Sequence, residues 1–580
     1  MKFSITTQLF TVLFTVFISS IGLCSNKSYT PSANFSSSFI KTQTTLDYNN
    51  ISAWFQNSGT FNQDIRTNNT PGFMWPKGSN RFAIFTSGLS IGGYINGALR
   101  LATASYSGEY QPGTINIING LPNPYTDTTF KIYKVSEGDN CNTNPDWANW
   151  GYMIPYGAPY IDANGNYQYD PCIDTPGVAG AGQTLFMCLT DAFPENHSQS
   201  EGFSGGTAPM NAEVRITAWA FNNRCVPGLE NSQFVRWQII NKNNKAWDKA
   251  RFSIVVDPDL GDATDDYIGC DTVRQMGYCY NSDNQDGTGN PPTYGQNPPA
   301  VGMRFLRSIK NKLSPDAESY GMNSFCYFTG TGAGGVTCEQ DPQQPIEAYN
   351  FMDGLKKDGT PWVTPSGFIP TKYTFPGNPV TLNGWTELGT NGIDTLGTVL
   401  NCGGNLTGTV YSSPAGDRRF VMSTGKENLT VNPLDTHEII ITQMIGKGSN
   451  NLNAVIKLLN YSDMVAQVFP VIFHDENPVI PVNILPDPNS IAPTSFYLSN
   501  NYPNPFNPVT KIKYGVPYDY QVSIIVYDIL GNEVQVLQNG IQSEGNYELE
   551  FNGSSLPSGV YYLRMKAGGF IVTRKMLLIK

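Results

Sequence analysis

Apolar and polar residues alternate with a period of two along most of this chain. The pattern is clearest in three segments that each end in a turn rich in Gly, Asn or Asp, 213–221, 234–241 and 251–257. This period is typical of β-strands, whose side chains point alternately to the two faces of a sheet. We find no repeat of 20–50 residues with a fixed period, which disfavours propellers and solenoids. The pattern predicts an all-β protein built of several antiparallel β-sandwiches.

One segment has the spacing of a helix instead. Asn450 is a suitable N-cap, and the apolar residues that follow recur every three or four positions. These residues are Leu452, Val455, Ile456, Leu459 and Val465. We therefore expect about one helix in the body of the protein, over 451–468.

The last 85 or so residues read as a separate unit. A proline-spaced stretch, 477–495, precedes them and is typical of a semi-rigid linker. Four short runs then alternate between apolar and polar residues, parted by turns such as LGN, NGS and AGG. The apolar positions are Ile512, Tyr514, Val516, Val522, Ile524, Val526, Tyr547, Leu549, Phe551, Tyr561, Leu563 and Met565. Two apolar faces of this kind predict a small antiparallel sandwich.

Four ordered motifs in this unit closely resemble a known family. The segments NYPNPFNPVTKIKYGVP, VYDILGNEV, LPSGVYYLRMKAGG and TRKMLLIK resemble the type A C-terminal sorting domain of type IX secretion system cargo, over residues 496–580. The resemblance implies an immunoglobulin-like sandwich that directs export of the folded protein across the outer membrane of a Gram-negative bacterium. It also implies two kinds of partner, the secretion machinery with its sorting peptidase, and surface lipopolysaccharide if the body is retained at the cell surface.

The body, residues 25–476, has a resemblance of its own. Segments such as GFMWPKG, GAPYIDANGNYQYD, PPAVGMRFL and AGDRRFVMSTG resemble uncharacterised large β-rich ectodomains of type IX cargo. This resemblance implies a shared fold and no particular reaction.

The N-terminus and the composition agree with export. Residues 1–24 have the features of a signal peptide: Lys2, a short apolar core and small residues before the expected cleavage site. That core is too short to span a bilayer, and no later segment is long and apolar enough, so we expect no transmembrane helix. The net charge of −11 disfavours a nucleic-acid partner. We expect an extracellular or outer-surface location.

Ten cysteines are compatible with disulfides in an exported protein. None forms a CxxC pair, which excludes a zinc ribbon. Cys326 and Cys338 flank the glycine-rich segment TGTGAGG, so a turn there would bring them together as a candidate bridge.

Catalytic signatures are scarce. The three histidines, His197, His437 and His474, occur in no HExxH motif or spaced pair, and a hydrolase would have to use paired carboxylates. Tryptophans offer stacking surfaces for sugars, and Trp147 and Trp150, in a loop, are better candidates for this than Trp219 and Trp237, which lie in strand patterns. Trp247 is a further surface candidate.

Acidic loops are the strongest chemical signal. Residues 257–271 contain six aspartates, and such crowding of like charge is repulsive unless a cation neutralises it. Calcium suits this role because it accepts six to eight oxygen ligands in flexible geometry. The candidate calcium ligands of this loop are Asp257, Asp259, Asp262, Asp265 and Asp266.

A second candidate calcium loop, 162–174, spaces its oxygens two residues apart, as EF-hand-like loops do. It departs from the EF-hand pattern because it lacks Gly at the sixth position and Glu at the twelfth. Its candidate ligands are Asp162, Asn164, Asn166, Asp170 and Asp174. A third acidic turn carries Asp283 and Asp286, and in all three loops the alternative is a solvated turn, since Asp and Asn are good turn formers.

Together these features predict a secreted or surface-attached protein, exported by the type IX system, with a non-enzymatic, calcium-stabilised structural or adhesive body. The alternative is a secreted protein that degrades or binds polysaccharides through paired carboxylates and exposed tryptophans.

Overall fold

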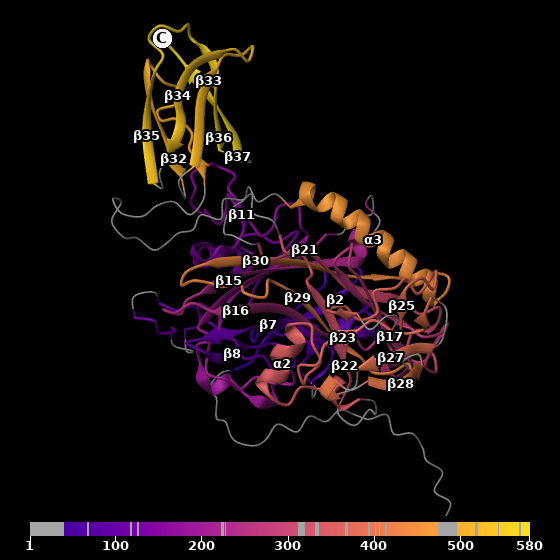
Figure 1. Cartoon of the computed structure of the whole chain (residues 1–580). Coiled ribbons are helices and arrows are strands. Elements are labelled where there is room, and N and C mark those ends of the chain that lie inside the picture. The colour runs from indigo at the N-terminus through magenta and orange to yellow at the C-terminus, as the bar shows by residue number, and fades with distance from the viewer. Residues whose placement is uncertain are drawn as a thin grey trace, which may run out of the picture. The chain divides into compact units, whose positions relative to one another are not determined.

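A computed structural model describes residues 40–580 of the chain, with gaps (Figure 1). The gaps are 67–68, 117–118, 124–126, 222–225, 227, 311–318, 331–335, 366–368, 392–394, 401, 405, 412–413, 474–495, 517–519, 543–544 and 568–569. The predicted signal peptide (1–24), the predicted linker (477–495) and His474 lie outside the described residues.

The largest sheet has nine strands. Eight of them follow the order β10-β13-β14-β15-β30-β21-β18-β17, β9 pairs with β13 beside this path, and every pairing is antiparallel. The strands are β9 (Gln111–Pro112), β10 (Tyr133–Ser136), β13 (Gln183–Thr190), β14 (Ala212–Ala220), β15 (Ser232–Asn241), β17 (Asp266–Asp271), β18 (Met276–Asn281), β21 (Ala300–Arg307) and β30 (Thr436–Gly446).

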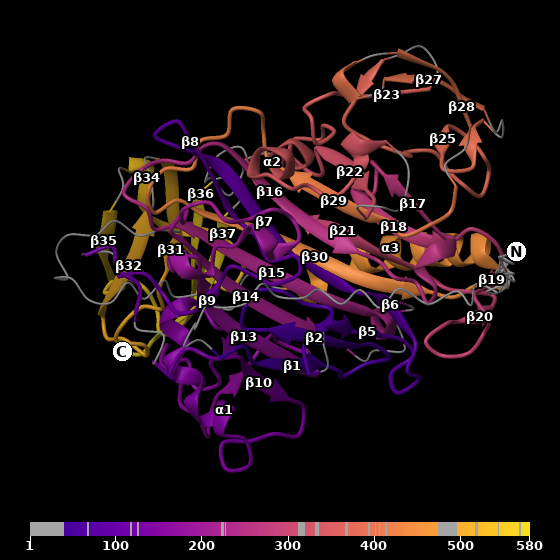
Figure 2. The same ribbon diagram turned by 90° about the horizontal axis from the view of Figure 1, so that it is seen from below.

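Two smaller sheets accompany it, seen beside one another in Figure 2. The five-stranded sheet has the order β22-β29-β16-β7-β8, with strands Ser324–Phe328, Arg419–Thr424, Asp248–Asp257, Thr86–Ile95 and Ala98–Ala102. The four-stranded sheet has the order β1-β2-β5-β6, with strands Gln43–Leu46, Ser52–Gln56, Phe73–Met74 and Phe82–Ile84.

Six two-stranded sheets complete the body as it is described. They are β3 (Gln63–Asp64) with β4 (Thr70–Pro71), β11 (Tyr160–Ile161) with β12 (Thr175–Pro176), β19 (Gln285–Asp286) with β20 (Gly295–Gln296), β23 (Trp362–Val363) with β24 (Pro370–Thr371), β25 (Trp385–Thr386) with β26 (Gly389–Thr390), and β27 (Thr395–Leu400) with β28 (Leu406–Tyr411).

The nine-stranded and five-stranded sheets share one hydrophobic core. Trp237 and Ile239 of β15 enter it from the larger sheet, and Phe252 and Ile254 of β16 enter it from the smaller one. The rings of Phe252 and His437, which lies on β30, are 5.9 Å apart across the interface. The apolar faces that the sequence pattern predicts are thus buried between two sheets that pack face to face.

The other face of the nine-stranded sheet is also buried. Phe234 of β15 and Ile440 of β30 point away from the shared core into a second cluster under helix α3 (Asn451–Ile472), which Figure 1 shows along β21 and β30. Near β10 and β13 the same face is covered by a third cluster, in which Phe186 of β13 packs with Trp150.

The sequence prediction of one helix is confirmed in place and in its N-cap. The Asn450 side chain accepts a hydrogen bond from the Asn453 backbone N–H, and α3 follows. Two shorter helices are present as well, α1 (Pro145–Asn149) and α2 (Pro345–Met352), each too short to give a helical period in the sequence. The all-β fold class is confirmed.

Residues 496–578 contribute a hydrophobic cluster of their own, formed between two antiparallel sheets. One sheet has the order β31-β32-β35 and the other β34-β33-β36-β37. Their strands are β31 (Tyr497–Leu498), β32 (Val509–Val516), β33 (Tyr520–Tyr527), β34 (Glu533–Gln542), β35 (Gly545–Asn552), β36 (Gly559–Ala567) and β37 (Phe570–Leu578). All twelve alternating residues singled out in the sequence lie in or against this cluster.

The packing of α3 generates a stability prediction. Leu458 is fully buried in the cluster under α3, whereas Ile456 is 39% exposed although the sequence placed it on the apolar stripe. Leu458→Ala should lower the free energy of unfolding by about 2–5 kcal/mol, and Ile456→Ala by less than about 1 kcal/mol. Urea denaturation followed by tryptophan fluorescence measures both, since Trp219 lies in the same cluster. Equal losses in the two variants would contradict this packing.

Candidate functional site

The first acidic loop, 257–271, is divided between two environments. Asp257 ends β16 and is buried, and its carboxylate accepts a hydrogen bond from the Tyr106 hydroxyl at 2.5 Å. The Nε atom of Arg419 lies 3.4 Å from the same carboxylate, and its guanidinium also pairs with Asp417 at 3.2 Å. Carboxylate oxygens of Asp257, Asp259 and Asp417 all lie within 4.8 Å of one another. An arginine from β29 therefore already supplies positive charge to this half of the loop.

The second half of the loop packs against the third acidic turn. Asp286 accepts a hydrogen bond from the backbone N–H of Asp262 at 2.8 Å, and Asp265 accepts one from the Asn281 amide at 2.7 Å. Asp266 is fully buried and accepts the Leu260 backbone N–H at 3.0 Å. Burial raises the pKa of Asp286 to about 6 and raises the pKa of Asp266 well above its ordinary value. Among the described residues, no Lys or Arg forms an ion pair with these four aspartates.

The second acidic loop, 162–174, is held by hydrogen bonds that involve all five of its candidate ligands. The side-chain amides of Asn164 and Asn166 both donate to one carboxylate oxygen of Asp170, each at 2.7 Å. Asp162 accepts backbone N–H groups from the following turn, at distances of 2.7–3.3 Å. Asp174 is buried and accepts the backbone N–H groups of Ala163 and Asp170 at 2.9 and 2.7 Å. The loop is thus closed by hydrogen bonds among its own side chains and backbone, with the two asparagine amides directed at Asp170.

A buried cluster of three carboxylates and one histidine escaped the sequence analysis. The His197 side chain is only 2% exposed and lies between Glu109 and Asp191, with ring-nitrogen to carboxylate distances of 3.4 and 3.6 Å. Its Nε2 atom is also 2.8 Å from the Asp191 carbonyl oxygen. No motif marks this cluster: Asp191, His197 and Glu201 lie in the connection between β13 and β14, and the fold brings Glu109 to them from a distant loop.

Backbone N–H groups hold the carboxylates of this cluster in place. Glu201 accepts hydrogen bonds from the backbone N–H groups of Ser105 and Tyr106, at 2.5 and 2.8 Å. Glu109 accepts hydrogen bonds from the backbone N–H groups of Gly206 at 2.8 Å and Thr103 at 3.0 Å. Because all three acids and the histidine side chain are buried, the cluster has the character of a structural polar core.

A surface cavity of about 840 Å³ lies beside the edge strand β10. Its aromatic residues are Tyr48, Trp147 of α1 and Phe221, and its acidic residue is Glu137. Figure 2 shows α1 next to β10, where this wall is formed. The remaining lining residues are Val135, Ser136, Gly138, Thr175, Pro176, Gly180, Ala181, Gly182 and Thr184.

The tryptophans separate into one lining residue and several core residues. Trp147 is half-buried and lines the cavity, as a surface role requires. The expectation for Trp150 and Trp247 was wrong, because both are fully buried. Trp219 and Trp237 are core residues, as their strand positions predicted.

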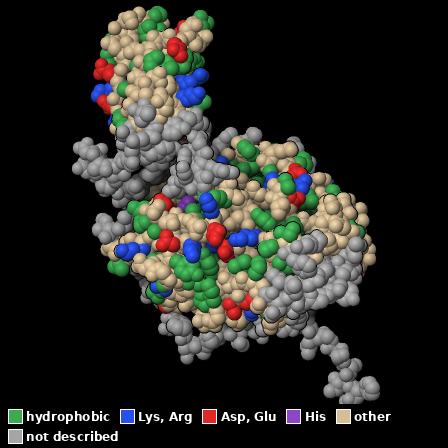
Figure 3. Space-filling view, viewed as in Figure 1, with side chains coloured by type: hydrophobic (Ala, Val, Ile, Leu, Met, Phe, Trp, Pro, Cys, Tyr) green, Lys and Arg blue, Asp and Glu red, His purple; other side chains and the backbone are tan. Residues whose placement is uncertain are grey.

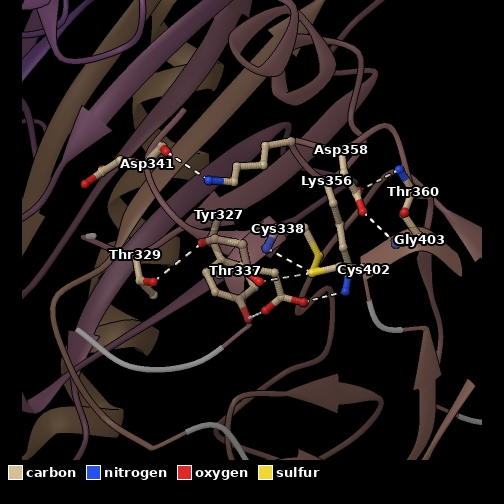
Figure 4. Close-up of a disulfide and its surroundings, with 12 residues drawn as sticks. Tyr327, Thr329, Thr337, Cys338, Asp341, Lys356, Asp358, Thr360, Cys402 and Gly403 are labelled. Atoms are coloured by element: carbon tan, nitrogen blue, oxygen red, sulfur yellow. Dashed lines mark hydrogen bonds and ion pairs between the residues drawn. A yellow bond between two sulfur atoms is a disulfide. The ribbon is translucent and has the colours of Figure 1, made fainter. Parts of the chain in front are cut away.

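The disulfides also differ from the sequence expectation. Cys338 pairs with Cys402 (Figure 4), and Cys141 pairs with Cys172. The predicted bridge between Cys326 and Cys338 was wrong, because Cys326 lies inside β22, where its buried thiol donates to the Phe351 carbonyl at 3.2 Å. Proximity along the chain is therefore a poor guide to this bridge: both cysteines are buried, but the thiol of Cys326 is directed at Phe351 and Cys338 lies beside Cys402.

The loop around Cys402 has further anchors. The Asp358 carboxylate accepts hydrogen bonds from the backbone N–H groups of Gly403 at 2.8 Å and Thr360 at 2.9 Å (Figure 4). The sulfurs of Cys338 and Cys402 lie close to this carboxylate, but because they are bonded to each other they are not metal ligands.

The visible surface is mixed in charge. On the face shown in Figure 3, acidic and basic side chains are interspersed among polar and apolar ones. Among the described residues no helix is both long and apolar enough to cross a membrane.

Comparison with protein families identifies the C-terminal unit. Residues 500–580 match the family of secretion system C-terminal sorting domains. The chain is therefore a cargo protein of the type IX secretion system that carries its sorting domain at residues 500–580. Comparison with curated protein sequences finds no match.

Solved structures add little. A polysaccharide lyase aligns at 8% identity and a TM-score of 0.17, over 85% of this chain and 46% of the lyase chain. The adhesin domain of Epf from Streptococcus pyogenes aligns at 7% identity and a TM-score of 0.12, over 64% of this chain and 94% of the adhesin chain. Dimeric latent PorU from Porphyromonas gingivalis aligns at 8% identity and a TM-score of 0.13, over 68% of this chain and 31% of the PorU chain. At TM-scores this low, none of them informs the fold or the function.

The buried cluster around His197 predicts a pH dependence of stability. Burial raises the pKa of Glu109 from 4.5 to about 7. The charge of Glu201 adds to this rise, and His197 opposes it. The folded protein then holds a proton that the unfolded chain releases. This proton stabilises the folded state fully below pH ~4.5, and the stabilisation is lost as the pH rises through about 7. The free energy of unfolding should fall by about 3 kcal/mol over this range.

Urea denaturation between pH 5 and 8 measures this effect. Glu109→Gln carries no titrating carboxyl, so its midpoint should fall less across this range than that of the wild type. The exposed Glu195→Gln, in the neighbouring turn, should follow the wild type. Parallel profiles for wild type and Glu109→Gln would refute the assignment.

Proposed function

We propose that this protein is a non-enzymatic ectodomain with a structural or adhesive role, released from or attached to the surface of a Gram-negative bacterium. The observation that carries the proposal is the sorting domain at 500–580, which follows a large β-rich body. Attachment would use the sorting peptidase and surface lipopolysaccharide as partners. The body consists mainly of β-sheets, and its buried acids and His197 are enclosed. These features support an adhesive or structural role rather than catalysis.

The hydrolytic alternative finds less support. A glycosidase places two carboxyl groups about 5–9.5 Å apart on either side of its substrate. Of the described residues that line the cavity beside β10, one is an acid, Glu137. The carboxylates Glu109 and Asp191 do lie on either side of one group, but that group is His197, and all three are buried.

We further propose that calcium stabilises the body. In loop 162–174 the side chains of Asn164 and Asn166 already meet at the carboxylate of Asp170, and an ion would replace these hydrogen bonds once the two amides turn their oxygens toward it. In loop 257–271 the half around Asp257 has Arg419 beside it, so an ion is favoured at the half around Asp262, Asp265 and Asp266. Calcium would supply a structural cross-link between loop segments and no chemistry.

Export should depend on the sorting domain. Deleting 496–580 should leave a folded body in the periplasm, and fusing 496–580 to an unrelated secreted reporter should carry that reporter outside. Cell fractionation with immunoblotting measures both, and resistance of the periplasmic body to trypsin reports that it is folded. Normal amounts of the truncated protein outside the cell would contradict the assignment.

Calcium should raise the melting temperature of the purified protein. A site that binds only the folded state contributes about 2.7 kcal/mol at a hundred times its dissociation constant, which is a shift of a few degrees for a body of this size. Thermal unfolding in chelator, followed by titration with calcium, measures the effect. Sodium chloride should imitate calcium only weakly and without saturation.

Matched variants locate the calcium site. Asp162→Asn/Asp170→Asn tests one loop and Asp262→Asn/Asp265→Asn the other, while Glu195→Gln/Glu427→Gln removes two exposed acids elsewhere. The response should shrink in a loop variant and persist in the control. Identical melting curves with and without calcium would mean that the loops are only acidic turns.

A further inference from the structure

The cavity beside β10 combines aromatic rings with acceptors and hydroxyl groups. Its rim is open to solvent, since Glu137, Gly138, Thr175 and Gly180 are all exposed. Its volume of about 840 Å³ is in the upper part of the ~300–1,000 Å³ range of ligand sites, so it has room for more than one sugar-sized ring.

The rings in this cavity have their polar atoms already engaged. The indole N–H of Trp147 donates to the Pro171 carbonyl at 2.8 Å, and the Tyr48 hydroxyl donates to the Glu137 carboxylate. The exposed part of Trp147 therefore offers a ligand its π-surface and no donor. Such a surface attracts partially positive C–H groups.

The hydrogen-bonding groups lie around the rings. Glu137 keeps one carboxylate oxygen beyond the one that Tyr48 engages, and Ser136 and Thr175 add hydroxyl groups. The Tyr48 ring itself is held tightly: a Cβ atom added at Gly182 would lie 1.8 Å from it, so no other residue at that position allows this wall.

The charge of the cavity limits the ligand further. Among the described residues that line the cavity, Glu137 is the one that carries a charge, and the whole protein carries −11. An anionic ligand such as a nucleotide, a sulfated glycan or a uronic acid polymer would meet like charge on approach. A neutral pyranose has both an apolar C–H face for an aromatic ring and hydroxyl donors for a carboxylate.

We propose that this cavity binds a short neutral oligosaccharide, or the corresponding segment of a neutral polysaccharide, with one sugar ring stacked on Trp147 and its hydroxyl groups bonded to Glu137. The inference rests on the proposed adhesive role and gives it a ligand class. It requires no catalysis.

The test applies purified residues 25–580 to an array of neutral oligosaccharides of two to six units, with sulfated and uronic acid glycans beside them. Affinity for the best neutral glycan is then measured by titration calorimetry. Trp147→Ala should weaken binding at least about tenfold, Trp147→Phe should retain most of it, and Glu137→Gln should weaken it by roughly three- to tenfold.

Two further variants separate loss of the site from loss of folding. Thr175→Tyr adds bulk at the exposed rim and removes no internal contact, so it should abolish binding with an unchanged melting temperature. Tyr152→Ala removes an aromatic ring that is 60% exposed in the same segment but outside the cavity lining, and it should bind like the wild type.

Several outcomes would overturn the proposal. They are no binding to any neutral glycan at millimolar concentration, binding only to anionic glycans, or binding that survives both Trp147→Ala and Thr175→Tyr. Saturable binding of a proline- or aromatic-rich peptide at this cavity in place of glycans would also overturn it. Export of the Trp147→Ala protein is followed in parallel and should be normal, so that failure of the ligand and failure of the surface location are told apart.

Discussion

Burial of both faces of the nine-stranded sheet is the constraint on which the body depends. Its strands carry large apolar side chains on each side, so neither face tolerates water. One face is covered by the five-stranded sheet. The other is covered by α3 over β21 and β30, and by the aromatic cluster around Trp150 over β10 and β13. The candidate cavity lies at the margin of this last cluster, where the cover ends and aromatic rings reach the surface.

Buried carboxylates are the second organising feature, in a chain in which charged residues are only 14% of the total. Burying an unpaired charge is costly, and here the compensation comes mostly from backbone N–H groups and from single arginines. Tyr106 connects two such places, because its backbone N–H donates to Glu201 and its hydroxyl donates to Asp257 beside Arg419. A continuous polar path therefore runs from the histidine cluster to the first acidic loop inside the body.

Acids that accept hydrogen bonds from backbone N–H groups fix the conformations of the loops they join. The C-terminal unit is built differently. Along its strands β35, β36 and β37, less exposed positions alternate with more exposed ones over most of their length, as in a thin two-sheet sandwich, and the unit forms its own hydrophobic cluster.

The sequence by itself determined the strands, the main helix and the route of export, because these depend on local period and on contiguous motifs. Apolar and polar residues alternate around Trp219, Trp237 and Ile254 as they do in strands, and Asn450 is recognisable in the sequence as the N-cap of α3. It also singled out the loop at 162–174, whose polar residues are neighbours along the chain and bond to one another in the structure.

Only the tertiary structure decided what distant segments do to one another. It placed 251–257 in a different sheet from the two similar segments before it. It also placed Arg419 beside Asp257, one of the aspartates for which the sequence predicted a metal ion as the neutralising charge. It paired Cys338 with Cys402 instead of Cys326, and it enclosed His197 between two acids. These relations depend on which loops meet when the sheets pack, and no local pattern of residues encodes that.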